Sequence, residues 1–377
     1  MSPVLPGATL GILGGGQLGR MVAMAARALG YRVHALDPYD RCPAAPVVDR
    51  LITAPFDDAD ATLELARGVD VLTLEIESVS VEGLRRAAAH AAVRPGAAVL
   101  EVIQDKGRQK TWLAAHGFPV GPFRLARSAG EVEAACAAFG HRAFVKRCEG
   151  GYDGRGQVTV TGADAASSAY ARLGGAPTVV EEALPLQAEL SVLVARRPSG
   201  AMATYPPALN HHAQRVLDLS VLPAPLPAQV TAEAVRLAED VARGLGVEGL
   251  LVVELFVLEG HRLVVNELAP RPHNTFHATE VACVTSQFEQ LVRAVCDLPL
   301  GGPEIMRPAA MANLLGEVWQ GRDAVPFDRA LEVPGLRLHL YGKEPRPGRK
   351  MGHLTAVGDT PVEALARVEE ARRRLGP

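Results

Sequence analysis

The sequence predicts a mixed α/β and α+β protein, in which a parallel α/β layer comes first and an antiparallel sheet follows. Residues 9–100 alternate short apolar runs with helix-like stretches, which is typical of a parallel layer. From about residue 143 onward, short strands follow one another through glycine-rich turns, a pattern that favours an antiparallel sheet with helices on one side. We therefore expect two kinds of sheet in one chain.

The parallel layer is expected to hold three strands and three helices, because its apolar runs are short and the stretches between them are rich in helix formers. The predicted strands are 9–14, 31–37 and 69–77, and the predicted helices are 17–30, 58–68 and 80–91. A connector and one helix follow at 94–117. Pro and Gly residues in 118–123 are consistent with a domain boundary.

The rest of the chain is expected to hold short strands, one long helix, a hairpin and a small α/β tail. The predicted strands are 143–147, 157–161, 178–184 and 188–197, the helix is 231–246, and the hairpin is 250–271. Residues 297–308 are predicted to be a linker, and the tail ends in a polar helix at 361–375.

The composition is that of an ordinary globular protein. The 377 residues are 48% hydrophobic and 21% charged, enough for two or three domains with their own cores. A net charge of -3 argues against a general affinity for nucleic acid. The chain has no apolar run of membrane-spanning length and no signal-peptide pattern, and its five cysteines form no C-x-x-C pair. We expect a cytoplasmic protein with neither nucleic-acid nor membrane partners.

Gly14, Gly16 and Gly19 have the G-x-G-x-x-G spacing of a dinucleotide-binding turn. They follow an apolar strand and open a helix, and Asp37 ends the next strand, where a carboxylate would hold a ribose hydroxyl. An NAD-dependent oxidoreductase is therefore one interpretation. The alternative is a tight strand-to-helix crossover that needs glycine for steric reasons alone.

The predicted hairpin contains two glutamates whose spacing indicates a metal site. If residues 259–262 form its loop, Leu258 faces Leu263, Phe256 faces Val265, and Glu254 faces Glu267. Opposed carboxylates need a positive partner, and oxygen ligands suit Mg²⁺. With a loop one residue shorter, the two glutamates would point to opposite faces. His273 and His277 also have a zinc-like spacing, but no carboxylate base lies between them, so we do not expect zinc there.

A second glycine-rich stretch indicates a phosphate loop. Lys146 ends a strand, and Arg155 lies among four glycines at 150, 151, 154 and 156. Backbone amides of such a loop can approach phosphate oxygens, although a flexible hairpin turn is the alternative. Arginine is otherwise the default basic residue, so the few lysines are candidates for phosphate contacts. The lysines are Lys106, Lys110, Lys146, Lys343 and Lys350.

Seven blocks in this order resemble the N5-carboxyaminoimidazole ribonucleotide synthetases, the ATP-grasp enzymes of bacterial and fungal purine synthesis. The blocks are residues 11–21, 104–110, 145–157, 179–184, 252–257, 266–274 and 341–354. Residues 150–157 and 346–354 separate this family from its ATP-grasp relatives. Together the blocks cover nearly the whole chain.

The resemblance implies a fold and a reaction. A Rossmann-like domain at 1–104 would no longer bind a dinucleotide, an ATP-grasp domain would span 105–300 with a glycine-rich lid at about 143–205, and a small domain at 301–377 would complete the acceptor site. The implied reaction uses ATP and bicarbonate to form carboxyphosphate, and then carboxylates 5-aminoimidazole ribonucleotide to N5-carboxyaminoimidazole ribonucleotide. ADP and phosphate are released, and the family forms homodimers.

The resemblance also implies an ATP site between two antiparallel sheets. Lys106 and Lys146 would contact the phosphates, Glu181 to Leu184 the adenine, and Glu189 the ribose, with His212 nearby. Glu254 and Glu267 would hold Mg²⁺ beside Asn266. The loop that would close over the phosphates comprises Gly151, Tyr152, Asp153, Gly154, Arg155, Gly156 and Gln157, and the adenine segment comprises Glu181, Glu182, Ala183 and Leu184.

For the acceptor ribonucleotide, the resemblance implies contacts from all three parts of the chain. The implied residues are Gln17, Glu75, Tyr152, Asp153, Arg271, His273, Asn274, Arg349 and Lys350. Asp153, Arg271, His273 and Lys350 would be catalytic, with Asp153 taking the proton of the attacking amine. Arg349 and Lys350 would hold the 5′-phosphate.

The chain departs from the family pattern at two places. Thr275 and Phe276 stand where the family has Ser-Gly, and Leu209 and Arg215 replace a Glu and a Gly around His212. The nearest alternative activity is a formate-dependent glycinamide ribonucleotide transformylase of the same superfamily. A binding paralogue without activity is disfavoured because Lys146, Glu254 and Glu267 are all present.

Overall fold

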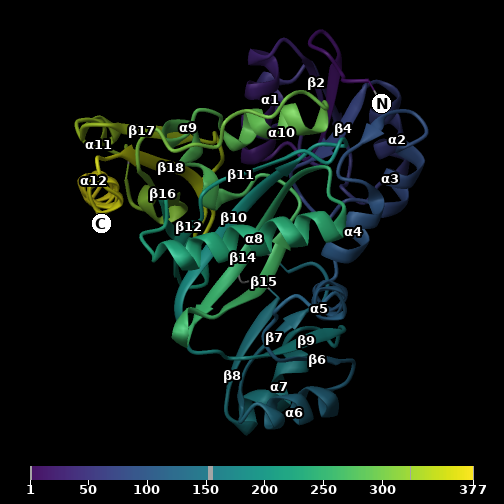
Figure 1. Cartoon of the computed structure of the whole chain (residues 1–377), viewed down its shortest axis with the longest axis vertical. Helices are drawn as coiled ribbons and strands as arrows, with labels where there is room; N and C mark the ends of the chain where they lie inside the picture. Colours follow the sequence, from purple (N-terminus) through teal and green to yellow (C-terminus); the bar gives the residue numbers. More distant parts are fainter. Residues whose placement is uncertain (1, 152–155, 323, 377) are drawn as a thin grey trace.

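The computed structural model describes residues 2–151, 156–322 and 324–376, which form three sheets and their covering helices (Figure 1). The helices of the first 130 residues or so are α1 (Gln17–Ala28), α2 (Ala59–Arg67), α3 (Val81–Ala87), α4 (Ala97–Ile103), α5 (Lys106–Ala115) and α6 (Ala129–Ala138). The later ones are α7 (Ala163–Arg172), α8 (Ala228–Leu245), α9 (Thr279–Ala282), α10 (Gln287–Val295), α11 (Phe327–Leu331) and α12 (Pro361–Arg374). Short 3-10 turns are η1 (Ala45–Val47), η2 (Glu259–His261), η3 (Asn274–Phe276) and η4 (Gly316–Trp319).

The first sheet is parallel, as predicted, with the order β3-β2-β1-β4-β5. Its strands are β1 (Thr9–Leu13), β2 (Arg32–Asp37), β3 (Arg50–Thr53), β4 (Val71–Leu74) and β5 (Ala92–Val93). The sequence did not predict β3 and β5, which are short and lie at the two edges. Where one helix was expected at 94–117, the structure has two, α4 and α5. The Asp105 side chain accepts from the Arg108 amide and so caps the N-terminus of α5.

A small antiparallel sheet lies at the lower end of the molecule in Figure 1, with α6 and α7 on one face. Its order is β6-β9-β7-β8, and its strands are β6 (Phe123–Ala126), β7 (Arg142–Arg147), β8 (Gln157–Thr161) and β9 (Thr178–Glu182). The glycine-rich lid was expected at about 143–205, but the small sheet has different bounds. It begins earlier, because β6 belongs to it, and it ends earlier, because residues from Leu186 onward belong to the large sheet.

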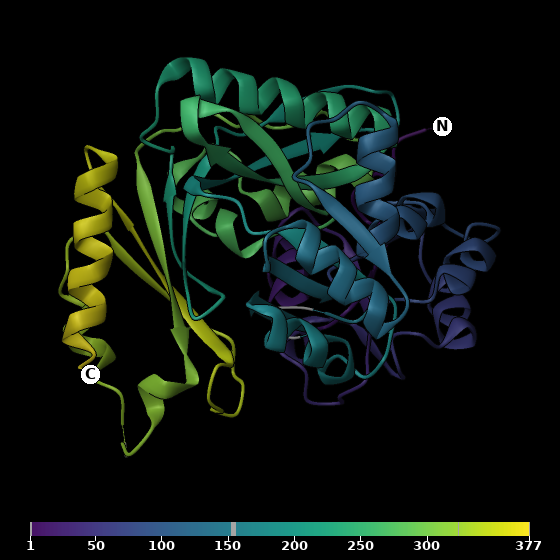
Figure 2. The same cartoon turned by 90° about the horizontal axis from the view of Figure 1, so that it is seen from below.

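The third sheet has nine strands in the order β15-β14-β10-β12-β13-β16-β18-β17, with β11 beside β10. The strands up to residue 222 are β10 (Leu186–Arg196), β11 (Met202–Thr204), β12 (Ala208–Ala213) and β13 (Val216–Leu222). The later strands are β14 (Gly249–Leu258), β15 (Leu263–Ala269), β16 (Ala309–Leu315), β17 (Leu336–Leu340) and β18 (Lys350–Val357). The tail after residue 300 therefore does not form a sheet of its own, and α12 packs against its strands (Figure 2).

Strand β14 is apolar on both sides because helices cover both faces of the large sheet. Leu251 and Val253 pack in the core that contains α8, whereas Leu250 and Val252 pack in the core that contains α10. A strand buried on both faces has an almost continuous apolar sequence, and GLLVVELFVL has one. Glu254 is the single charge in this strand.

The register of the β14–β15 hairpin differs from the predicted one near the turn, but Glu254 still faces Glu267. Its loop is the three-residue turn Glu259–His261, so Val257 pairs with Leu263 and Phe256 with Val264, and the predicted Leu258–Leu263 and Phe256–Val265 pairs are wrong. A β-bulge between Glu254 and Leu255 then inserts Asn266 as an extra residue in β15. Beyond the bulge, Glu254 pairs with Glu267, as predicted.

Candidate active site

The glycine turn after β1 is filled by two carboxylates of the chain itself. The amides of Gly16 and Gly19 donate to Glu75 Oε1 and Oε2 at 2.6 and 3.1 Å. The Gly15 amide donates to Asp37 Oδ2 at 2.8 Å. Amides at this position of a strand-turn-helix unit are those that a dinucleotide pyrophosphate would use. Glu75 and Asp37 take that place.

The glycines are needed because Glu75 and the backbone of the turn itself come so close to them. A Cβ atom on Gly16 would lie 2.6 Å from Glu75 Oε1, and one on Gly19 would lie 2.3 Å from the Gly14 carbonyl oxygen. Burial raises the pKa of Glu75 to about 7, although the two amides favour its ionised form. The glycine spacing therefore has a steric explanation that requires no dinucleotide.

Glu254 and Glu267, which face each other across the hairpin, each have a polar partner. Lys106 Nζ donates to Glu267, and His273 Nε2 lies 3.2 Å from Glu254 Oε1. Asn266 Nδ2 donates to Glu254 Oε2 at 3.3 Å. Burial opposes ionisation of Glu254, but His273, His212 and Lys106 together outweigh burial and lower the pKa of Glu254 to about 2. Glu254 is therefore a carboxylate at neutral pH.

This donor set fits a hard divalent cation. Besides the two glutamate carboxylates, Asn266 Oδ1 is buried and has no hydrogen-bond partner among the described residues. Oxygen donors of this kind suit Mg²⁺. The predicted metal ligands thus lie together, at the end of the hairpin next to α5.

Two lysines share one buried carboxylate beside this group. Lys146 Nζ lies 2.5 Å from Glu181 Oε2, and Lys110 Nζ lies 3.3 Å from Glu181 Oε1. Burial would raise the pKa of Glu181, but the two ammonium groups lower it to about 2. Lys106 is also close: burial lowers the pKa of Lys106, but Glu267 and, to a smaller extent, Glu181 raise it.

The predicted adenine segment lines a small cavity between the two antiparallel sheets. Glu181, Glu182 and Leu184 lie on one side, and Phe256 and Val265 of the hairpin lie on the other. The cavity measures about 10 Å³, which is the space of about one water molecule. The Ala183 amide donates to the Arg142 carbonyl at 2.9 Å and fixes the segment to β7.

Glu189 and His212 form a pair on neighbouring strands of the large sheet. His212 Nδ1 lies 2.9 Å from Glu189 Oε2. Burial lowers the pKa of His212, but the hydrogen bond to Glu189 and the charges of Glu189 and Glu254 together outweigh burial and raise it. Arg215, one of the departures from the family pattern, donates to Thr159 Oγ1 on β8 at 2.7 Å and so links the large sheet to the small one.

The loop before β18 brings Lys343 to the first domain. Lys343 Nζ donates to Gln17 Oε1 at 2.5 Å, between residues 326 positions apart. Arg271 Nε lies 2.8 Å from Glu77 Oε1, and the charges of Arg271 and Lys343 both act on Glu75. Predicted acceptor residues from the first domain and the large sheet are thus held by ion pairs and hydrogen bonds at one junction.

Lys350 and Arg349 differ in exposure. Lys350 is buried at the start of β18. The burial of His277 lowers the pKa of His277 most, and the charges of His339 and Lys350 lower it further. Arg349 is half-buried, and its Nη1 donates to the Glu344 carbonyl at 3.1 Å. Asn274 Oδ1 lies 3.2 Å from His277 Nε2.

His277 belongs to a stack of rings apart from His273. Its ring lies 4.0 Å from that of His353, which lies 4.6 Å from that of His339 with an interplanar angle of 13°. Donor atoms of Glu280, His339 and His353 lie within 4.8 Å of one another. One ion cannot lie in the planes of two nearly parallel rings, and burial lowers the pKa of both imidazoles. This geometry is that of a neutral imidazole stack.

Part of the predicted phosphate loop lies outside the described residues. These positions are Tyr152, Asp153, Gly154 and Arg155. At its two ends, the Arg147 amide donates to the Gly156 carbonyl at 2.9 Å, and Lys146 pairs with Gln157 in the β7–β8 ladder. Gly151 precedes the undescribed positions.

The fold brings three further residues to these groups, namely Lys110, Glu77 and Lys343, to which the sequence assigned no specific role. Lys110 and Lys343 were among the few lysines of an arginine-rich chain, and Lys110 follows Lys106 by one helical turn on α5. That spacing was a usable signal. Glu77 had none, because a charged residue just after a strand is usually solvated.

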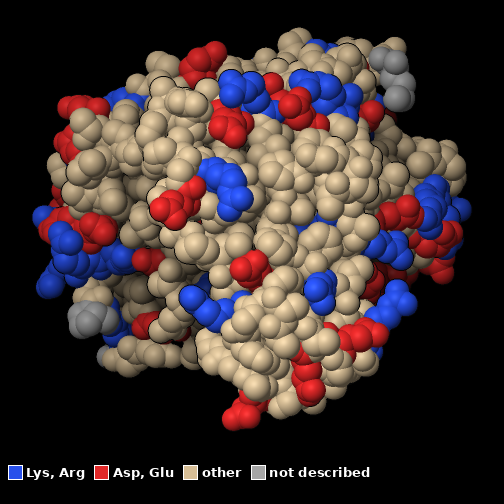
Figure 3. Space-filling view, turned by 60° about the horizontal axis from the view of Figure 1, so that its bottom comes forward, with Lys and Arg blue, Asp and Glu red and all other residues tan. Residues whose placement is uncertain are grey.

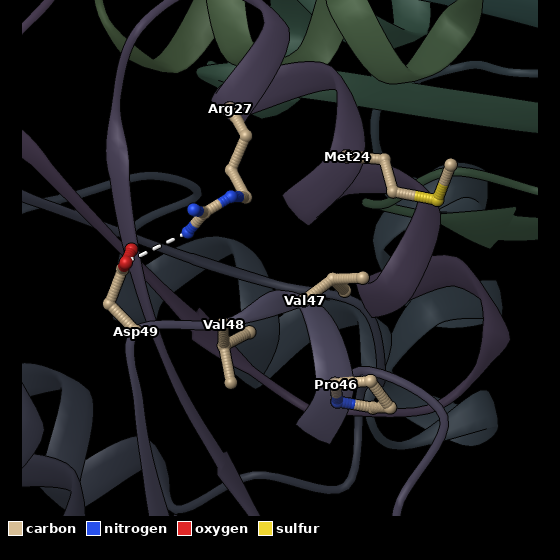
Figure 4. A pocket seen from close by; sticks show the side chains of 6 residues that line it. All are labelled: Met24, Arg27, Pro46, Val47, Val48 and Asp49. Carbon is tan, nitrogen blue, oxygen red and sulfur yellow. Dashed lines mark hydrogen bonds and ion pairs between the residues drawn. The ribbon is translucent and has the colours of Figure 1, made fainter.

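A second cavity lies away from this site. It measures about 400 Å³ and lies between α1 and η1, where Arg27 and Asp49 form an ion pair of 2.8 Å (Figure 4). None of the predicted site residues lines it. On the face seen in Figure 3, basic and acidic side chains are interspersed. No helix in the described ranges is long and apolar enough to cross a membrane.

Family models match three consecutive parts of the chain. A ribonucleotide synthetase preATP-grasp domain matches residues 7–104, an ATP-grasp domain matches 111–288, and a phosphoribosylaminoimidazole carboxylase C-terminal domain matches 309–367. Two curated relatives carry the name N5-carboxyaminoimidazole ribonucleotide synthase. The Brucella melitensis protein is 42% identical and the Bacillus subtilis protein 38% identical, with 93% of this chain and 97% and 92% of those proteins covered.

Solved structures agree in fold over the whole length. The ADP complex of an N5-carboxyaminoimidazole ribonucleotide synthetase superimposes with a TM-score of 0.93 at 37% identity, covering 99% of this chain and 98% of that one. An Aspergillus clavatus synthase in complex with ADP and 5-aminoimidazole ribonucleotide has a TM-score of 0.89 at 30% identity and covers 98% of each chain. The predicted fold class, with an N-terminal parallel domain and an ATP-grasp fold, is confirmed.

Proposed function

Because this chain belongs to the N5-carboxyaminoimidazole ribonucleotide synthase family, we propose that it carboxylates 5-aminoimidazole ribonucleotide at the expense of ATP. It is an ATP-grasp carbon–nitrogen ligase of purine biosynthesis. The observation that supports this most directly is the group around the hairpin: paired Glu254 and Glu267 lie beside Lys106 and His273. An NAD-dependent oxidoreductase has no use for this group, and its cofactor turn is filled by Glu75.

ATP binds between the small sheet and the hairpin in this proposal. Lys106 and Lys146 leave Glu267 and Glu181 for the phosphates, residues 181–184 contact the adenine, and Glu189 holds the ribose near His212. Glu254, Glu267 and Asn266 hold Mg²⁺, which neutralises phosphate charge when bound. The chain's own part is to supply fixed cations and to keep water away from the transferred group.

The reaction proceeds in two stages. An oxygen of bicarbonate attacks the γ-phosphorus of ATP, ADP leaves, and carboxyphosphate forms. Its C–O bond to phosphate then breaks to give CO₂ and phosphate, and the exocyclic amine of the ribonucleotide adds to CO₂ and loses a proton. Asp153, outside the described residues, is the proposed proton acceptor, and Arg271 and His273 line the path between the two substrates.

The acceptor binds where the first domain, the large sheet and the β18 loop meet. Gln17 and Glu75 come from the first domain, Asn274 from η3, and Arg349 and Lys350 supply positive charge for the 5′-phosphate. Bicarbonate as the carbon source, a homodimer and a cytoplasmic location complete the proposal, as the family resemblance implies.

The test is ADP release from the purified full chain with ATP and Mg²⁺. We expect ADP to form at a high rate only when both the ribonucleotide and bicarbonate are present, with ¹³C-bicarbonate appearing as a carbamate in NMR spectra. Glycinamide ribonucleotide with formate is the matched alternative pair of substrates. Stimulation by that pair, or no stimulation by either, would overturn the proposal.

A further inference from the structure

Lys110 joins the two sheets that enclose the proposed nucleotide site. Its side chain, in the middle of α5, is only 6% exposed. The Nζ atom lies 3.3 Å from Glu181 Oε1 on β9 of the small sheet, and it donates to the Val265 carbonyl on β15 of the large sheet at 3.4 Å. One ammonium group therefore contacts both sides of the cavity.

Glu181 has two counter-ions with different surroundings. Lys146, at 2.5 Å from Oε2, comes from β7 just before the glycine-rich loop, whereas Lys110 comes from α5 and borders the cavity. With its side chain 11% exposed, Glu181 is nearly buried. A carboxylate buried to this extent is strongly unfavourable without a positive partner. If Lys146 leaves, Lys110 is the remaining cation in direct contact among the described residues.

The cavity beside Lys110 is too small for an adenine ring. At about 10 Å³ it has room for about one water molecule. The cavity must therefore widen for a nucleotide to enter, and Glu181 has to keep its charge compensated while it does.

We propose that Lys110 is a positioning residue for nucleotide binding: it stays on Glu181 as a standing counter-ion, so that Lys146 can leave Glu181 for a phosphate. The inference rests on the proposed ATP site. Lys110 itself touches neither the phosphates nor the reacting atoms. With Lys110 in place, Lys146 can exchange its contact with Glu181 for one with a phosphate, and Glu181 still has a positive partner.

The first test is the affinity of the full chain for Mg-ADP, measured by calorimetry on the wild type and on Lys110→Met. Methionine keeps the unbranched stem and removes the charge. Among the described residues, Lys146 then remains the only counter-ion of Glu181, and we expect ADP to bind about tenfold to a hundredfold more weakly. Arg108→Met is the control, because Arg108 is exposed on the same helix two residues earlier. It should bind ADP like the wild type.

The second test removes the charge that Lys110 compensates. In Glu181→Gln, Lys146 has no carboxylate to hold it, so adding Lys110→Met should change ADP affinity less than about threefold. A role in packing alone predicts that the loss persists in this background. Equal losses in both backgrounds, or no loss in either, would overturn the proposal. If Lys110→Met alone fails to fold, Lys110→Gln replaces it in both backgrounds, and the same comparison decides.

This measurement is independent of the carboxylation reaction. ADP binding is measured without ribonucleotide or bicarbonate, so an enzyme with a different acceptor would still show the coupling between Lys110 and Glu181. Conversely, a chain that carboxylates the ribonucleotide normally but shows no coupling would overturn only the role of Lys110.

Discussion

Glu254 faces Glu267 because Asn266 forms a β-bulge in the strand that carries Glu267. From the turn to Leu255 the hairpin follows a register that would oppose Glu254 to Asn266 and turn Glu267 to the other face. The bulge adds one residue to β15 and restores the pair. It also leaves the Asn266 amide beside Glu254, to which its Nδ2 donates. One extra residue thus decides whether the two carboxylates can share a cation.

Replacing one of these carboxylates should stop ATP turnover while leaving the fold intact. In Glu267→Gln, Mg²⁺ loses one charged ligand and Lys106 loses its partner. We expect ADP formation to fall by at least about tenfold, with a larger loss at limiting Mg²⁺. Far-UV circular dichroism should match the wild type. Glu259→Gln, at an exposed position of the same hairpin, is the control. Near-normal turnover at limiting Mg²⁺ would contradict the metal assignment.

Lys350 should act on the acceptor and not on the nucleotide. It is buried at the start of β18 near His277, so a solvated surface role does not describe it. Lys350→Ala should slow carbamate formation and lower kcat/KM for the ribonucleotide about tenfold to a hundredfold, since one charge-assisted contact to an anion is lost. Nucleotide affinity should stay close to normal. Steady-state kinetics in both substrates decide this, and an equal loss in the ATP dependence would refute the assignment.

The glycine turn should bind no nicotinamide cofactor, because its amides already donate to Glu75 and Asp37. Titration with NADH or NADPH, followed by the fluorescence of the cofactor, should show no saturable binding. An authentic dehydrogenase serves as the positive control in the same buffer. Saturable micromolar binding that ATP does not displace would show that the two carboxylates can be expelled from the turn.

Glu280 should make the protein less stable as the pH rises toward neutrality. Burial raises its pKa from 4.5 to about 7, so the folded chain keeps this proton after the unfolded chain has lost it. The contribution favours folding below pH 4.5 and is lost between about pH 4.5 and 7. Glu280→Gln removes this dependence. Its free energy of unfolding should therefore rise relative to the wild type by up to about 3 kcal/mol over that range.

Urea unfolding at pH 5 and pH 8 measures this difference. Glu233→Gln, at an exposed position of α8, is the matched control and should show the same difference from the wild type at both pH values. A constant difference between Glu280→Gln and the wild type would mean that Glu280 ionises normally in the folded protein.

The sequence by itself determined the two kinds of sheet. Strand and helix periods are local properties, and the parallel layer, an antiparallel sheet and the hairpin were predicted from them, whereas β6, β12 and β13 were not. Resemblance of seven blocks was also enough to identify the family. The short edge strands β3 and β5 escaped prediction because two to four residues carry too little pattern.

Only the tertiary structure decided which partner each buried charge has. Glu75 fills a glycine turn 59 residues before it, Lys343 reaches Gln17 across 326 positions, and Lys110 meets both Glu181 and Val265. No local pattern encodes such pairs, because a buried charge is stabilised by whatever opposite charge the packing brings near it. The bulge at Asn266 has the same origin, since register depends on contacts along the whole ladder and not on the loop alone.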